Sequence, residues 1–218
     1  MKVVFHNKIS ESCEVGILEI PPVEAHEIMG TVTLTKNEKV ELTRIKNDNR
    51  KKEIIGTRFL IRKMLGNNAK IFYDEFGKPH LKKSSLHISI SHSHQYVAVI
   101  IDKKHSTGID IQKITPKILR IKDKFLNRKE LAEIESNKDI SGQLHLYWGV
   151  KESIYKEHGK GNINFAEQIL IEPVDIIRSN EVKATLDWEL GRKKFVLEFK
   201  FFNGFMLVYI RDLANIVS

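Results

Sequence analysis

Cysteine, proline and glycine are scarce in this sequence. Its 218 residues include one cysteine, five prolines and 12 glycines. The single thiol, Cys13, cannot form an intrachain disulfide and has no partner for a CxxC zinc or redox motif, so a reducing, cytoplasmic compartment is expected. The low proline and glycine contents, together with 41% hydrophobic residues, exclude collagen-like, low-complexity and disordered chains.

Long apolar runs are also missing. The longest is about six residues, as at positions 96–101, whereas a helix that spans a bilayer needs about 20. The amino-terminal stretch MKVVFHNKIS is interrupted by polar residues too early for the apolar region of a signal peptide. We therefore expect neither a signal peptide nor a membrane partner.

Positive charge is what the sequence has in excess. Lys and Arg number 36 against 28 Asp and Glu, which gives a net charge of +8 at pH 7. Such an excess favours an anionic partner. Nucleic acid, acidic lipid, a phosphate-rich cofactor and an acidic protein all satisfy that condition, and an ordinary solvated surface has the same composition.

Hydrophobic spacing predicts helices followed by strands in the first half of the chain. Residues 48–65 have the spacing of a basic amphipathic helix, and Gly66 suits a left-handed cap at its end. Apolar and polar residues alternate over 86–91, and an apolar run follows over 96–101. This pattern predicts two strands with a turn near 92–95. This half therefore combines a helix with a hairpin.

The second half repeats the same order. Pro116 is placed to open one helix, Asn127 and Glu130 resemble a capping pair for another, and a third helix is expected over 142–159. Strands follow, with a hairpin turn at residues 203–204. The sequence thus predicts two α+β halves of similar build, with their junction near 104–107.

Three polar clusters are candidates for chemistry, and the first contains His87, His92 and His94. Zinc is one interpretation, but no cysteine or carboxylate accompanies these histidines at ligand spacing. Polar residues on an exposed hairpin, or a turn that contacts phosphate, are the alternatives.

The other two clusters centre on carboxylates. Asp110 follows Gly108 in a strand-like stretch, where it is either a surface residue or an inward-facing acid that needs a cation. Glu152 and Lys156 are four residues apart on a predicted helix, one turn after Trp148. Such a pair is most often a solvent-exposed ion pair, so each cluster is ambiguous alone.

Together, the clusters form a recognisable two-part signature. Gly-Ile-Asp at residues 108–110 is followed by Trp-x-x-Lys-Glu-Ser-x-x-Lys at residues 148–156, and Glu152 comes 42 residues after Asp110. In this the chain resembles the 4′-phosphopantetheinyl transferase superfamily. Gly-Lys-Pro at residues 77–79 and Ile-Ser-His-Ser at residues 90–93 are similar to the larger, two-lobed type that activates peptide synthetases. The resemblance runs from about residue 50 to residue 160.

The resemblance implies an α+β pseudodimer of two similar lobes, each a small antiparallel sheet packed with helices. The first lobe, 1–106, would grip coenzyme A, and the second, 107–218, would carry the metal and the catalytic helix. The expected enzyme transfers the 4′-phosphopantetheine group of coenzyme A to a serine of an apo acyl or peptidyl carrier protein. Adenosine 3′,5′-bisphosphate would be released.

The resemblance also assigns roles to residues. Asp110 and Glu152 would bind Mg²⁺ through oxygen atoms, and Glu152 would take the proton of the serine, with Lys156 as a third catalytic residue. Phosphate charge and the adenosine end of coenzyme A would be held by a larger set: Arg58, Lys78, Pro79, Ser91, His92, Lys151 and Lys156.

Position 112 departs from the family pattern, which has Glu where this chain has Gln. The amide of Gln112 can give one oxygen to Mg²⁺, or hold a water ligand, but it adds no charge. We therefore expect Gln112 in the metal site, with metal and coenzyme A binding cooperatively, and we expect Gln112→Glu to lower the Mg²⁺ requirement.

The expected partner is an acidic acyl or peptidyl carrier protein, met by a monomer. A non-catalytic module of the same fold, which binds a carrier protein or another polyanion, is the alternative that Gln112 allows. Nucleic acid is not an expected partner, because no combined basic and aromatic motif of a known module is present.

Overall fold

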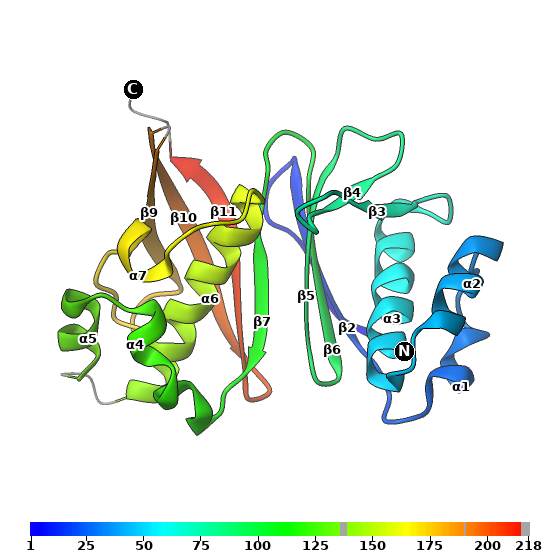
Figure 1. Ribbon diagram of the computed structural model, residues 1–218, viewed down its shortest axis with the longest axis horizontal. Helices are drawn as coiled ribbons and strands as arrows, with labels where there is room; N and C mark the ends of the chain where they lie inside the picture. Colours follow the sequence, from blue (N-terminus) through cyan, green and yellow to red (C-terminus); the bar gives the residue numbers. More distant parts are fainter. Residues whose placement is uncertain (136–138, 190, 215–218) are drawn as a thin grey trace.

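Two antiparallel sheets, each packed with helices, make up the protein (Figure 1). The computed structural model describes residues 1–135, 139–189 and 191–214. This arrangement confirms the predicted α+β fold with two similar lobes. The chain passes from the first sheet to the second between residues 102 and 109, while the exact division at 106 and 107 stays a prediction. No helix in the described ranges is both long and apolar enough to cross a bilayer.

The first lobe contains a six-stranded sheet. Its strands lie in the order β1 (Lys2–Lys8), β2 (Cys13–Glu19), β6 (Tyr96–Asp102), β5 (His87–Ser93), β4 (Pro79–Leu81) and β3 (Ile71–Tyr73). Three helices accompany it: α1 (Ala25–Met29), α2 (Lys36–Arg44) and α3 (Asp48–Leu65).

The second lobe contains a five-stranded sheet. Its strands lie in the order β7 (Ile109–Lys113), β11 (Phe205–Ala214), β10 (Gly191–Phe202), β9 (Glu181–Trp188) and β8 (Ile169–Ile171). A 3₁₀ helix, η1 (Pro116–Arg120), precedes α4 (Lys122–Phe125), α5 (Arg128–Glu135), α6 (Ile140–His158) and α7 (Phe165–Gln168).

Local signals explain where the two long helices begin and end. The side chain of Asn47 accepts a hydrogen bond from the Arg50 N–H and caps α3 over its predicted range. Gly66 ends that helix at φ 91° and ψ 164°, so the predicted left-handed cap was wrong in ψ, although a positive φ still favours glycine. Asp139 caps α6, which begins at Ile140, two residues before its expected start, and Gly159 closes it in the left-handed conformation.

Shorter predicted features have mixed outcomes. Asn127 and Glu130 form the predicted reciprocal capping pair, because each side chain accepts a hydrogen bond from the backbone N–H of the other. Pro116 opens a 3₁₀ helix instead of an α-helix. The hairpin turn at 203–204 is confirmed, and both of its residues have positive φ.

The lobes share a third apolar cluster besides their own cores. It combines residues of β2 and β6 from the first sheet with residues of β7 and β11 from the second. Among its members, Val15, Ile100, Ile109 and Tyr209 are all inaccessible to solvent. The two sheets are therefore packed together through an apolar interface, which fixes one lobe against the other.

Serine hydroxyls on β5 join the lobes beside this interface. The backbone N–H groups of Ile109, Ile111 and Lys113 donate to the hydroxyls of Ser89, Ser91 and Ser93, each at 3.2 Å. The hydroxyl of every second residue of β5 thus accepts a hydrogen bond from the backbone of every second residue of β7. Figure 1 shows the two strands side by side. These contacts hold Asp110, which lies between Ile109 and Ile111, at the junction of the lobes.

Candidate active site between the lobes

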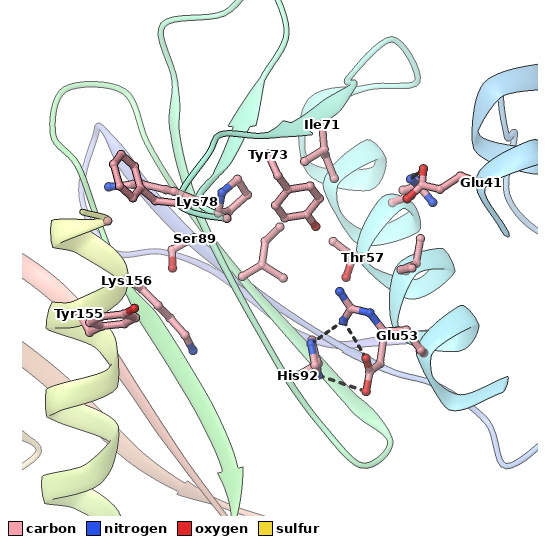
Figure 2. Close-up of a pocket in the computed structure, with 18 of the residues that line it drawn as sticks. Glu41, Glu53, Thr57, Ile71, Tyr73, Lys78, Ser89, His92, Tyr155 and Lys156 are labelled. Carbon is pink, nitrogen blue, oxygen red and sulfur yellow. Dashed lines mark hydrogen bonds and ion pairs between the residues drawn. The ribbon is translucent and has the colours of Figure 1, made fainter. Parts of the chain in front are cut away.

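A cavity opens where α3, the β3–β4 segment, β5 and α6 converge (Figure 2). In the described part of the chain, β4 pairs with β5 only through His80 and His87. Beyond that pair, Ser89, Ile90 and His92 of β5 form one wall of the cavity. Both lobes contribute lining residues, since Tyr155 and Lys156 of α6 face the residues of the first lobe. Predicted residues that line it are Arg58, Lys78, Pro79, His92 and Lys156.

Two glycines let α6 approach the second sheet closely. A Cβ atom at Gly108 would lie 1.8 Å from the carbonyl oxygen of Ser153, and one at Gly149 would lie 2.6 Å from Val208 Cγ2. Any larger residue would force the helix away from β7 and β11. The glycine of Gly-Ile-Asp therefore brings the helical half of the signature up to Asp110.

Asp110 and Lys156 meet beside the cavity. Lys156 Nζ donates to Asp110 Oδ1 at 2.8 Å, to Ser91 Oγ at 3.0 Å and to the carbonyl oxygen of Ile109 at 3.0 Å. Ser91 Oγ in turn donates to Asp110 Oδ1 at 2.9 Å. Asp110 is 6% exposed, so it is the inward-facing acid of the two alternatives, and its cation is Lys156.

Glu152 lies one turn before Lys156 on α6, within electrostatic reach of Asp110. Burial, followed by the negative charge of Asp110, raises the pKa of Glu152 to about 7, against the lowering effect of the Lys156 charge. The described residues donate no hydrogen bond to its carboxylate. Lys156 therefore compensates the charge of Glu152 only in part, and a bound cation would favour the ionised form of this carboxylate.

The two carboxylates suit Mg²⁺ better than a softer metal. The described residues contain no group of three or more His, Cys, Asp or Glu side chains that could hold a metal ion. Mg²⁺ is commonly bound by one or two carboxylates, and its remaining ligands are waters and substrate phosphates. Asp110 and Glu152 fit that pattern, whereas zinc would need a fuller protein ligand set.

Gln112 lies next to Asp110, and both its amide nitrogen and its amide oxygen have partners. Gln112 Nε2 donates to Asp110 Oδ2 at 3.2 Å and to the backbone oxygen of His145 at 3.0 Å. Its oxygen, Oε1, is 2.9 Å from His145 Nδ1. The Gln112 oxygen therefore points toward His145. Its contact with a metal stays a prediction.

His92 forms a triangle with two residues of α3 that the sequence did not single out. Its Nδ1 lies 3.2 Å from Glu53 Oε1, and its Nε2 lies 3.0 Å from Arg50 Nη1. Arg50 Nη1 also donates to Glu53 Oε2 at 2.9 Å, and Figure 2 shows these contacts at one wall of the cavity. Burial lowers the pKa of His92, partly against the attraction of Glu53. No motif signals Arg50 and Glu53, because their spacing is that of an ordinary surface ion pair.

Arg58 and Lys78 are held in place by protein partners. Arg58 pairs with Glu38 at 3.1 Å and with Glu41 at 2.6 Å, while its buried Nη1 has no hydrogen-bond partner among the described residues. Lys78 Nζ donates to Ser106 Oγ at 2.8 Å and to a backbone oxygen of α6. Burial lowers the pKa of Lys78. Both cations line the cavity with little freedom to move.

Lys151 lies elsewhere, contrary to its predicted contact with phosphate. Its side chain is inaccessible to solvent, and its Nζ donates to Glu130 Oε2 at 2.8 Å and to backbone oxygens of Phe165 and Ile169. These partners belong to the second lobe, away from the cavity wall. Lys151 is one residue before Glu152, so the turn of the helix points the two side chains to different sides.

Comparison with known proteins supports the motif resemblance. Residues 106–203 match the model of the 4′-phosphopantetheinyl transferase superfamily. The predicted resemblance to this superfamily is confirmed over that part of the chain, which holds Asp110, Glu152 and Lys156.

Curated relatives agree with the superfamily match. The chain is 32% identical over 114 residues to a 4′-phosphopantetheinyl transferase called gsp from Aneurinibacillus migulanus. The matched segment covers 50% of this chain and 47% of that protein. It is 35% identical over 91 residues to the 4′-phosphopantetheinyl transferase Sfp of Bacillus subtilis, which covers 40% of each chain. The matched segments thus span less than half the length of these relatives.

Proposed function

We propose that this protein transfers the 4′-phosphopantetheine group of coenzyme A to a serine hydroxyl of an acyl or peptidyl carrier protein. The observation that carries this proposal is the junction of Asp110, Glu152 and Lys156 beside a cavity lined with basic residues from both lobes. A pyrophosphate linkage must break next to an attacking alcohol. Such a reaction needs a metal site, a base and fixed cations in one place.

Asp110 and Glu152 would hold Mg²⁺ through carboxylate oxygens. When bound, the cation would neutralise the negative charge of the pyrophosphate. Glu152, which the bound cation would keep ionised, would accept the serine proton directly or through a water. Lys156 leaves its contact with Asp110 and donates to a phosphate oxygen from the same turn of α6. The products are the modified carrier and adenosine 3′,5′-bisphosphate.

The remaining cavity wall fits the rest of coenzyme A. His92, Arg58 and Lys78 present nitrogen donors for phosphate oxygens, and Arg50 adds a guanidinium to that set. Apolar side chains on the same wall, among them Tyr73 and Pro79, suit the adenosine end. We further propose a cytoplasmic monomer that meets an acidic carrier through its basic surface.

A non-catalytic carrier-binding module is the second candidate. It is favoured by one observation: position 112 has Gln, which brings no charge to the metal site, and its amide oxygen faces His145. Such a module would bind coenzyme A or carrier protein without turnover.

Transfer to an apo carrier protein, followed by mass spectrometry with coenzyme A and Mg²⁺, separates the two candidates. We expect turnover by the wild type and loss of at least about a hundredfold in Asp110→Ala and Glu152→Ala, since each removes a ligand and leaves phosphate charge uncompensated. Asp187→Ala removes an exposed carboxylate on β9 and is the matched control, for which we expect an unchanged rate. A rate within a few-fold of wild type in either site variant contradicts the site assignment.

A further inference from the structure

The side chain of Gln112 uses both of its N–H donors and one lone pair of its oxygen. It donates its two N–H groups to Asp110 Oδ2 and to the backbone oxygen of His145, and its oxygen accepts from His145 Nδ1. The reverse orientation of the amide would place its oxygen against two acceptors, a carboxylate and a peptide carbonyl. The hydrogen-bond network therefore fixes which amide atom faces Asp110.

His145 is itself held from its other side. His145 Nε2 lies 2.9 Å from the backbone nitrogen and 3.1 Å from the carbonyl oxygen of Thr115. Because the Gln112 oxygen at Nδ1 can only accept, the neutral ring carries its proton on Nδ1, and the Thr115 N–H donates to Nε2. His145 is 2% exposed, so water does not compete with Gln112 for its Nδ1. His145 thus offers the Gln112 oxygen a single, fixed donor.

Close packing leaves the Gln112 amide little room to turn. A Cβ atom at Gly149 would lie 3.3 Å from Gln112 Nε2, so the backbone of α6 covers the amide directly. Asp110 is consequently held on both of its oxygens, Oδ1 by Ser91 and Lys156 and Oδ2 by Gln112. Lys156 can leave when ligands bind, whereas Gln112, which is only partly exposed, is packed against the backbone of the helix.

We propose that Gln112 and His145 are positioning residues that fix the Asp110 carboxylate for a divalent cation, and that Gln112 is not a metal ligand. This inference rests on the proposed function only in that Asp110 and Glu152 hold the cation. An acid at position 112 would face Asp110 with a second negative charge, and it could relieve that repulsion only by binding the cation. The amide of Gln112 instead donates a hydrogen bond to Asp110. Position 112 thus supplies no third metal ligand in this chain and orients the ligand Asp110.

The two roles predict opposite effects when His145 loses its donor. If Gln112 were a ligand, His145 would compete with the cation for the Gln112 oxygen, and His145→Leu would leave metal binding unchanged or tighten it. If Gln112 positions Asp110, the same change loosens the amide and weakens metal binding. Partners that orient metal ligands typically change affinity by about 10- to 100-fold, so we expect a loss of about tenfold.

The experiment measures Mn²⁺ binding to the protein by electron paramagnetic resonance, without coenzyme A or carrier. We expect weaker binding in His145→Leu, recovery in His145→Asn, whose amide N–H can replace Nδ1–H, and a similar loss in Gln112→Met. The double variant should bind no more weakly than the weaker single variant, because both changes break one unit. Leu144→Ala, a core cavity in the same turn of α6, controls for lower stability and should keep wild-type affinity.

Each other outcome overturns a specific statement. Equal or tighter Mn²⁺ binding in His145→Leu overturns the positioning role while the proposed function stands. Weak binding in Leu144→Ala as well as in His145→Leu assigns the loss to stability and also overturns it. Mn²⁺ binding that is absent from the wild type even after coenzyme A is added, or unaffected by Asp110→Ala, refutes the metal site of the proposed function and the inference with it.

Discussion

Glu152 is a carboxylate placed where ionisation is costly. Burial and the charge of Asp110 raise its pKa from 4.5 to about 7, so the folded protein binds its proton more tightly than the unfolded chain does. Folding therefore takes up a proton between pH 4.5 and about 7, and the free energy of unfolding decreases as the pH rises through this window.

Replacing Glu152 with Gln, which cannot ionise, should remove that cost. We expect Glu152→Gln to be about 2–3 kcal/mol more stable than wild type at pH 8 and close to wild type at pH 4.5. Urea unfolding at the two pH values measures the difference, and Glu75→Gln, an exposed residue, is the control. A stability difference that does not depend on pH would show that packing, not ionisation, separates the variants.

Glu53 is a carboxylate in the wall where phosphate is expected to bind. It lies against both His92 and Arg50, so a phosphate that approaches these donors must displace it or accept its repulsion. We expect Glu53→Gln to bind coenzyme A several-fold more tightly than wild type, as measured by titration calorimetry. Glu75→Gln changes the net charge equally outside the cavity and should leave the affinity unchanged.

Coenzyme A that lacks the 3′-phosphate extends this test. If the 3′-phosphate is the group near Glu53, the gain from Glu53→Gln should disappear with dephospho-coenzyme A. Weaker binding of coenzyme A itself by Glu53→Gln would instead mean that Glu53 orients Arg50 and His92 for the ligand.

Among the secondary-structure elements, β7 depends on the serines of β5, whose hydroxyls accept the backbone hydrogen bonds that a neighbouring strand would otherwise accept. Ser89 is 2% exposed and accepts from the N–H of Ile109, which is inaccessible to solvent. Ser93 makes the same kind of contact with Lys113 in an exposed position. A buried N–H without a partner costs about 1–3 kcal/mol, whereas an exposed one can bond to water.

Two matched alanine substitutions test this ladder. We expect Ser89→Ala to lower the free energy of unfolding by about 1–3 kcal/mol and Ser93→Ala to change it by less than about 0.5 kcal/mol. Chemical denaturation monitored by tryptophan fluorescence gives both values. Equal effects of the two substitutions would mean that the hydroxyls do not support β7.

Local signals predicted the elements whose causes are local. The limits of α3, the Asn127–Glu130 capping pair and the turn at 203–204 depend on neighbouring residues, and the structure has all three. The strands β1 and β2 were not predicted, because β2 pairs with β6, about 80 residues later in the chain. The alternating serines of β5 were visible, but their contact with β7 depends on how two sheets pack.

The site was predictable where its residues form a motif. Asp110 and Lys156 meet as the two-part signature implies, and Gly108 shows why glycine is needed there. Lys151 was misplaced because adjacent residues of a helix point to different sides. His145 was missed because a histidine within an apolar helix has no spacing that marks it.

Two features involve the whole molecule: the apolar interface between the lobes and the excess of positive charge. The shared cluster of β2, β6, β7 and β11 keeps the two lobes in register, and the cavity is complete only when both are present. The net charge of +8 acts over longer distances than any contact within the cavity.

The net charge of +8 predicts that salt weakens the capture of an acidic carrier. If the basic surface attracts an acidic carrier, the association depends on a field that salt screens beyond about 8 Å at physiological ionic strength. We expect the KM for carrier to rise several-fold as NaCl is raised from about 50 to about 500 mM, as electrostatically steered association weakens with salt. The KM for coenzyme A should rise less, because its phosphates would contact partly buried groups such as Lys78 at short range. Initial rates at fixed Mg²⁺, with each substrate varied in turn, give both values. A KM for carrier that does not depend on salt would mean that the carrier is held by apolar contacts and that the charge of +8 serves another purpose.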